Sequence, residues 1–165
     1  MSSPFDDLLA ANADYAARSE LTGFDGIARA GVAIVTCMDS RIEPLQMLGL
    51  THGDAKIFRN PGGRVTEAAL EALVLGVHLL NVNRILVVPH TKCAMASSTQ
   101  NELREKVSAK SGQDAWWQHF NVVPDQKVAL AEDVRTLTSH PLIQGRAEVG
   151  GFLYDVDTGL LSQII

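Results

Sequence analysis

Short apolar runs alternate along the chain with longer segments whose apolar residues recur every three or four positions. Three apolar runs predict strands, at 31–36, 55–59 and 84–89. Helical spacing predicts helices over 5–19, 44–49, 66–80, 98–109 and 125–138. Two further strands, 151–156 and 160–164, flank a turn at 157–159, a pattern typical of a β-hairpin.

This order of elements predicts an α/β fold, with a mainly parallel sheet flanked by helices and a C-terminal β-hairpin. The run GVAIVT at 31–36 is continuously apolar, as expected for a buried strand of a parallel sheet. Thr66 is a candidate N-cap for the helix that follows it. That helix is apolar nearly all round, so we expect it to be well buried. Since there is no linker, repeat or low-complexity tract, we expect a single domain over 1–165.

Composition narrows the class of protein. The chain has 165 residues, of which 46% are hydrophobic and 20% charged, and this excludes a disordered or fibrous chain. There are 14 basic and 19 acidic residues, so the formal charge is −5. An acidic chain without a basic run is a poor candidate for binding nucleic acid, which depends on neutralising phosphates.

Two features bear on location. The longest uncharged apolar stretch, 72–83, covers twelve residues, whereas a membrane-spanning helix needs roughly 20. The first twenty residues carry acids where a signal peptide would carry bases, so we expect a cytoplasmic protein with no membrane partner.

Cys37 and Cys93 are the two cysteines, which excludes a disulfide framework. They are either small core residues or chemically active thiols.

The residues at two predicted strand ends suggest a metal site. Cys37 and Asp39 follow the first strand, and His90 and Cys93 follow the third. Ligands of parallel sheets bind in the crevice beyond the carboxyl ends of the strands. Thiolate and imidazole are the groups that zinc prefers. Cys37, His90 and Cys93 are therefore predicted to bind zinc.

The number of ligands favours a catalytic site over a structural one. Structural zinc sites have four protein ligands, while catalytic sites keep one position open for water. Asp39 is the local candidate for a fourth ligand, or else for an acceptor that hydrogen-bonds to a metal-bound water. Arg41 can hold this carboxylate through paired charge-assisted hydrogen bonds. Because two thiolates neutralise Zn²⁺, such a centre acidifies water less than one with three neutral histidines.

Each of these residues also has a simpler interpretation. Asp39 and Arg41 could form an exposed ion pair of little energetic value, and His90 could be a satisfied core histidine. Glu43 occupies the position where a phosphatase loop would need arginine, so that alternative is excluded. The other histidines are expected to be structural or solvated: His52, His78, His119 and His140. Trp116 and Trp117 are expected to be packing or interface residues.

Four segments together resemble the β-class carbonic anhydrases: CMDSR at 37–41, RNPG at 59–62, HTKC at 90–93 and GFLYDVDTGLL at 151–161. The paired C-x-D-x-R and H-x-x-C signature is specific in combination. The resemblance covers about residues 30–165, and the short length is similar to the compact bacterial branch.

The resemblance implies a fold, a reaction and a set of site residues. Cys37, His90 and Cys93 match the zinc ligands. Asp39 matches the carboxylate that either accepts a hydrogen bond from zinc-bound water or becomes a fourth ligand in a closed, inactive site. Arg41 matches its partner in the open form. The implied reaction is reversible hydration of carbon dioxide to bicarbonate and a proton by zinc-bound hydroxide.

The resemblance also implies an assembly. Members of the family form homodimers or dimers of dimers, with active sites at the dimer interface. We therefore expect the N-terminal helix 5–19 to pack on a partner subunit.

The chain departs from the family's usual pattern at two positions beside the zinc ligands. Ala94 stands where glycine is usual, and Lys92 places a positive charge where an acid is common. Neither is a ligand, so we expect zinc binding to survive and any effect to fall on efficiency or pH dependence. Two alternatives stay open: a hydrolase for carbon disulfide or carbonyl sulfide on the same scaffold, and a non-catalytic interaction module stabilised by zinc.

Overall fold

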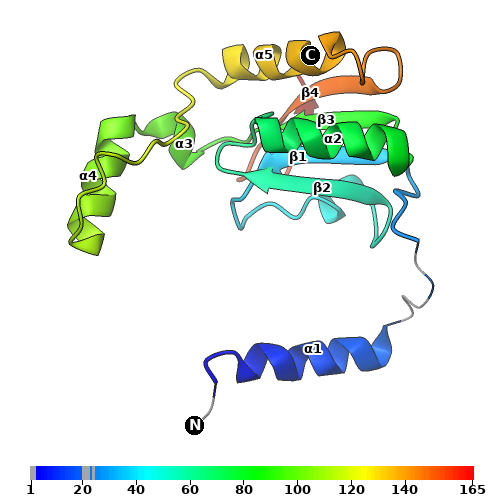
Figure 1. Cartoon of the computed structure of the whole chain (residues 1–165), viewed down its shortest axis with the longest axis horizontal. Coiled ribbons are helices and arrows are strands. Elements are labelled where there is room, and N and C mark those ends of the chain that lie inside the picture. The colour runs from blue at the N-terminus through cyan, green and yellow to red at the C-terminus, as the bar shows by residue number, and fades with distance from the viewer. Residues whose placement is uncertain (1–2, 20–22, 24) are drawn as a thin grey trace.

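The computed structural model describes residues 3–19, 23 and 25–165, and it is built around one five-stranded sheet in the order β2-β1-β3-β4-β5 (Figure 1). The strands are β1 Val32–Cys37, β2 Ala55–Asn60, β3 Arg84–Val88, β4 Glu148–Tyr154 and β5 Leu161–Gln163. The helices are α1 Asp6–Arg18, the 3₁₀ helix η1 Gln46–Leu48, α2 Glu67–Leu79, α3 Ala94–Ser97, α4 Gln100–Ser111 and α5 Gln126–Ser139. The α/β prediction is confirmed, with element ends shifted by a few residues and α3 added.

The apolar pattern of β1 explains its central position. All six of its residues are buried, and it pairs in parallel with β2 on one side and β3 on the other. A strand without a polar face has no side to present to water, so it is stable only inside the sheet with both faces covered. This places the end of β1 next to the end of β3, where Thr36 lies opposite Val88.

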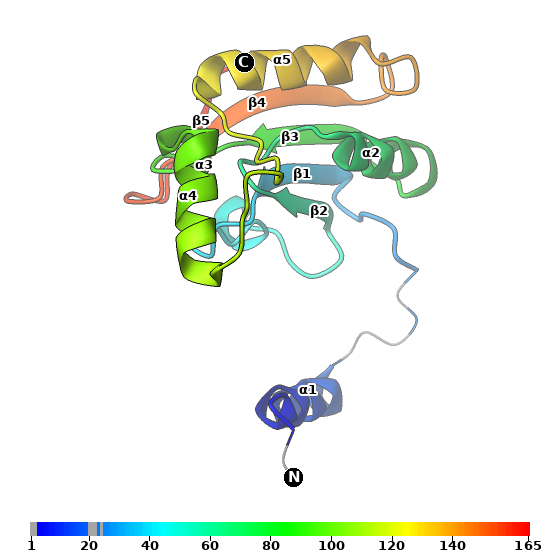
Figure 2. The ribbon, with the colours of Figure 1, turned by 60° about the vertical axis from the view of Figure 1, so that its left-hand side comes forward.

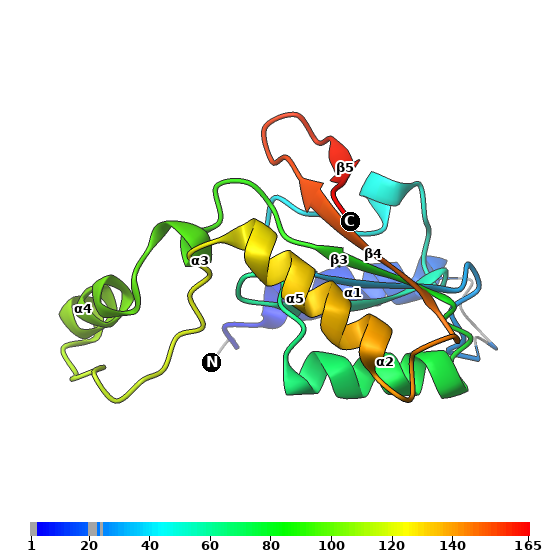
Figure 3. The same cartoon turned by 90° about the horizontal axis from the view of Figure 1, so that it is seen from above.

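Different elements cover the two faces of the sheet. Helices α2 and α5 lie along the same face, as seen from above in Figure 3. Their core includes Leu73 from α2, Leu137 from α5, and Val35 and Val87 from the sheet. The opposite face is covered by the loop around η1, by α3 and by the C-terminal hairpin, and its buried cluster contains Cys37 and Cys93.

The C-terminal hairpin is confirmed, but its first strand begins earlier than predicted. Strand β4 starts at Glu148, pairs in parallel with β3 and then runs antiparallel to β5. Gly150 lies within this early part, 148–150. Glycine lowers β-propensity, which hid this part of the strand from the sequence pattern. Gly151 allows α5 to approach, since a Cβ there would lie 3.0 Å from Leu130 Cγ.

The expectation that α2 is well buried is correct for only one side of the helix. Thr66 caps it as predicted, accepting a hydrogen bond from the Ala69 amide. Its buried residues are Ala69, Leu73 and Gly76, whereas Leu75 and Leu79 are 46% and 68% exposed. One helix can rest only one face on a sheet, so the second apolar face of α2 lies at the surface.

Helix α1 lies apart from the sheet and its covering helices (Figures 1 and 2). None of its residues is buried, and Leu8 and Leu9 are each 63% exposed. This amphipathic helix gains no apolar burial from the described part of its own chain. Among the described residues, no helix combines the length and the apolarity that spanning a bilayer requires.

Candidate metal centre

Three potential ligand atoms converge where β1 and β3 end. Cys37 is the last residue of β1, and His90 and Cys93 follow β3. Their donor atoms all lie within 4.8 Å of one another, and all three residues are buried. The two sulfur atoms are 4.0 Å apart. Two thiolates bound at about 2.3 Å to one tetrahedral zinc would lie roughly 3.8 Å apart, so the spacing fits that ion.

The loop after β3 is shaped to return Cys93 toward His90. Thr91 donates its amide to the Tyr154 carbonyl at 2.9 Å, and Tyr154 donates its own to the Pro89 carbonyl at 3.0 Å. These bonds extend the β3–β4 pairing past the end of β3. Lys92 then adopts a left-handed conformation with φ 55°, which reverses the chain. Ala94, at the position where the family usually has glycine, begins α3 without a positive φ, so alanine is accommodated there.

His90 supplies the clearest sign that a ligand belongs at this site. The residue is fully buried, and its Nδ1 contacts the Thr91 carbonyl at 2.8 Å. Its Nε2 is the buried side-chain nitrogen or oxygen atom without a hydrogen-bond partner among the described residues. Leaving such an atom unpaired costs roughly 1–3 kcal/mol. A metal ion held by Nε2 and the two sulfurs would remove that cost.

The electrostatics of the site favour one thiolate. The Cys93 thiol, with smaller contributions from His90 and the Gly62 amide, lowers the pKa of Cys37 against the effect of burial. The same contact with Cys37, together with burial, raises the pKa of Cys93. Burial by itself lowers the pKa of His90, but its contact with Cys37 outweighs burial and raises it. Cys37 is therefore the thiol of the pair that favours its anionic form.

The loop after β2 supports the end of β1. The Gly62 amide points at Cys37 Sγ over 3.4 Å. Arg59 donates to the carbonyl oxygens of Cys37 and Asp39, at 2.9 and 2.5 Å. No role for Arg59 or Gly62 could be predicted from the sequence, where the RNPG loop is marked only by its place in the resemblance. Their contacts join segments about twenty residues apart, so no local pattern reports them.

Asp39 and Arg41 form a two-point ion pair beside the three donors. Arg41 Nε and Nη2 donate to the two Asp39 oxygens at 2.8 and 2.7 Å. These bonds hold the pKa of Asp39 well below its ordinary value, so the carboxylate stays ionised. Asp39 is not one of the three mutually close donors, although its Oδ2 lies 3.8 Å from His90 Nε2. It therefore lies at the edge of the site, held by Arg41.

The other residues considered from the sequence lie elsewhere. His78 Nε2 contacts the Leu142 carbonyl, and His119 Nε2 contacts Asn121 Oδ1. Trp116 and Trp117 are 49% and 78% exposed, and the Arg104 guanidinium lies 5.9 Å from the Trp116 ring. Packing within the chain does not bury these tryptophans, so an interface role stays a prediction.

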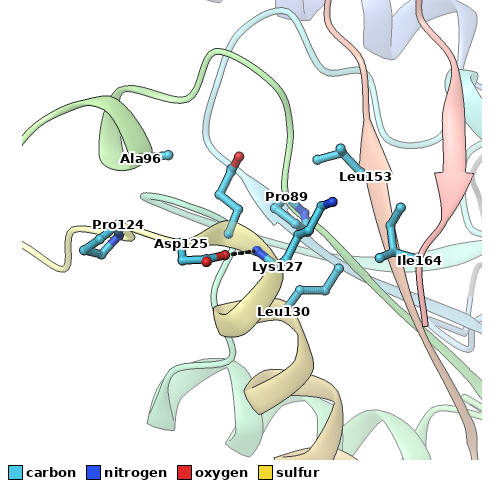
Figure 4. A pocket seen from close by; sticks show the side chains of 9 residues that line it. Pro89, Ala96, Pro124, Asp125, Lys127, Leu130, Leu153 and Ile164 are labelled. Atoms are coloured by element: carbon cyan, nitrogen blue, oxygen red, sulfur yellow. Dashed lines mark hydrogen bonds between the residues drawn. The ribbon is translucent and has the colours of Figure 1, made fainter.

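A cavity of about 370 Å³ lies between the end of β3 and the start of α5 (Figure 4). Its apolar lining residues are Pro89, Ala96, Pro124, Leu130, Leu153 and Ile164. Gln126 connects the cavity to the metal centre, because its Nε2 donates to the His90 carbonyl at 2.9 Å. The three donor residues do not line it.

Comparison with known proteins places this centre in a family. The family model described as carbonic anhydrase matches residues 32–136. The chain therefore belongs to the carbonic anhydrase family, whose members are lyases, and its fold is that of the β class.

Individual relatives agree in both sequence and structure. Beta-carbonic anhydrase 1 of Mycobacterium tuberculosis is 31% identical over 163 residues, covering 96% of each chain. The crystal structure of a carbonic anhydrase from Streptococcus mutans matches with a TM-score of 0.87 and 36% identity, covering 100% of this chain and 99% of that one. A carbon disulfide hydrolase from an Acidianus species is 29% identical over 148 residues, 76% of this chain and 72% of its own.

Proposed function

We propose that this protein catalyses the zinc-dependent, reversible hydration of carbon dioxide to bicarbonate and a proton. The observation that carries the proposal is the buried His90 Nε2, unpartnered among the described residues, beside two cysteine sulfurs. Three donors at one point fit a metal that keeps a position for water. The family relationship favours carbon dioxide as the substrate.

Each residue has a distinct task in this proposal. Cys37, His90 and Cys93 would hold the ion, and Arg41 keeps the Asp39 carboxylate outside the donor set. When bound, zinc supplies a Lewis acid that lowers the pKa of water. Asp39, ionised because of its bonds to Arg41, is an acceptor that can orient a water molecule near His90 Nε2.

The test is stopped-flow hydration of carbon dioxide by zinc-loaded protein between about pH 6.5 and 9. The proposal expects activity that rises with pH, disappears when a chelator removes zinc and returns when zinc is restored. The matched variant is Asp39→Asn, which keeps all three donors and should retain zinc while turnover falls. A flat trace at every pH, with one zinc per chain established by elemental analysis, would favour the non-catalytic module.

Carbon disulfide hydrolysis is the second candidate, favoured by relatives that carry that name. Four are 27–29% identical to this chain. Carbon disulfide is a linear electrophile like carbon dioxide, so the same three-donor centre suits both. Release of hydrogen sulfide from carbon disulfide, measured on the same zinc-loaded sample, distinguishes the two substrates.

We also propose that the protein works as a homodimer or a dimer of dimers in which α1 packs on the partner subunit. Support comes from the exposed side chains Leu8 and Leu9 on α1, which are not buried against the residues of their own chain that the structure describes. An apolar hollow between α2 and the edge strand β2, lined in part by Ile57 and Leu75, offers a surface for such contacts. Light scattering should give a mass of two or four chains. Replacing both leucines with serine should lower that mass, whereas replacing the exposed Leu160, which lies on another element, should not.

A further inference from the structure

The turn between β4 and β5 contacts the loop 90–93, which carries two of the predicted metal donors and is called the metal loop below. Lys92 Nζ lies 2.5 Å from Asp157 Oδ2, in an ion pair whose side chains are 63% and 58% exposed. Next to it, the Val156 amide donates to Thr91 Oγ1 at 3.1 Å. The turn is thus joined to the metal loop by one ion pair and one hydrogen bond, across more than sixty residues of sequence.

The backbone of Lys92 extends this contact to the Asp39–Arg41 pair. Its carbonyl accepts a hydrogen bond from Arg41 Nη2 at 3.3 Å. The same Nη2 donates to Asp39 Oδ2 at 2.7 Å. Lys92 holds its carbonyl there with a left-handed backbone, φ 55°, which an L-residue adopts only at a cost in free energy. The ion pair with Asp157 restrains the side chain of that residue.

We propose that Lys92 and Asp157 are positioning residues, which hold the Lys92 carbonyl against Arg41 and so keep Asp39 turned away from the metal position. The effect of these two residues on catalysis depends on the function proposed above. Asp39 Oδ2 is 3.8 Å from His90 Nε2, so the carboxylate needs only a short movement to compete for the ion. Arg41 opposes that movement, and the Lys92–Asp157 pair supports Arg41.

Charge supports the same assignment. The pKa of Arg41 is raised mainly by its hydrogen bonds to Asp39, and the negative charge of Asp157 adds to the rise. Asp157 therefore acts on the guanidinium in two ways, directly through its charge and indirectly through Lys92.

The experiment follows the Arg41 Nε–H signal in ¹H–¹⁵N spectra of the full-length, zinc-loaded protein. Arg41→Lys identifies the signal by its loss. We expect Lys92→Met and Asp157→Asn each to speed the exchange of this proton with water roughly two- to fivefold, the range for an exposed ion pair. The double variant should show no further increase, because both changes break the same pair. Lys92→Arg should restore protection.

Lys110→Met, in the last turn of α4, is the matched control and should leave the signal unchanged. Methionine keeps the length of lysine and carries no charge, and at Lys92 it meets the same backbone strain. In the same samples, the midpoint of the pH–rate profile should shift for both single variants and not for the control.

Two results would overturn the proposal: unchanged Arg41 exchange in both single variants, or increases that multiply in the double variant. Failure of the proposed function has a different signature. If the wild type hydrates no carbon dioxide while Arg41 exchange changes as expected, the positioning role stands and the assigned reaction is wrong.

Discussion

Gly63 offers a test of how closely the loop after β2 approaches β1, the strand that ends at Cys37. Its φ is +66°, a conformation that alanine rarely adopts. A Cβ built there would lie 3.0 Å from the Cys37 amide nitrogen and 3.0 Å from the Thr36 carbonyl carbon. Both are backbone atoms of a buried central strand, so neither can rotate out of the way.

The expected cost of Gly63→Ala has two parts. A left-handed conformation costs an L-residue about 1–2 kcal/mol. Overpacking against a rigid neighbour adds about 1–3 kcal/mol. The sum, about 2–5 kcal/mol, is a large share of the roughly 5–15 kcal/mol that stabilises a typical domain. Because the displaced atom belongs to Cys37, we also expect weaker zinc binding.

Comparison with Gly112→Ala separates the cost of overpacking from the cost of the left-handed conformation. Gly112 has nearly the same φ, +68°, but no atom lies within 4 Å of the Cβ position. Chemical denaturation of both variants, at one protein concentration and with the same metal content, should show Gly63→Ala less stable than Gly112→Ala by about 1–3 kcal/mol. A competition assay with a metallochromic chelator should show lower zinc affinity for Gly63→Ala alone. Equal destabilisation and equal affinity would refute the close approach.

Three more predictions follow from particular contacts. Cys93→Ser should lose zinc, because a hydroxyl is a poor substitute for a thiolate; full zinc occupancy by elemental analysis would contradict the ligand assignment. Asp133→Ala should lower the unfolding free energy by about 2–3 kcal/mol in a denaturation assay, since it removes the nearly buried partner that Arg64 contacts at 2.6 and 3.0 Å. The pKa of Asp39 is lowered in the folded state from its ordinary value of 3.8. The ionised carboxylate therefore stabilises the fold at any pH above about 3.8, and this stabilisation is lost as the pH falls below that value. In metal-free protein, the difference in unfolding free energy between wild type and Asp39→Asn should therefore stay constant above about pH 5 and shrink below about pH 4; a constant difference throughout would show that the ion pair does not stabilise the fold.

The sequence determined the positions of the strands to within a few residues, the mainly parallel arrangement of the sheet, and the residues that meet where β1 and β3 end. The apolar run of β1 has no polar face, which already requires a central strand covered on both sides. Once β1 and β3 are parallel strands, Cys37 and His90 must lie at the same edge of the sheet, and Cys93 is brought there by a loop of two residues. These features depend on local pattern and on the geometry of parallel strands, so they could be predicted without coordinates.

Only the tertiary structure decided how distant segments support that edge. The bonds from Arg59 to the end of β1, from Gln126 to the His90 carbonyl and from Asp157 to Lys92 join residues 20 or more positions apart. No local pattern marks such polar residues, because their partners are set by the packing of whole elements. The packing of whole elements also explains why apolar faces of α1 and α2 stay exposed. Helical periodicity shows which residues are apolar, but the shape of the sheet decides which apolar side is buried in the chain's own core.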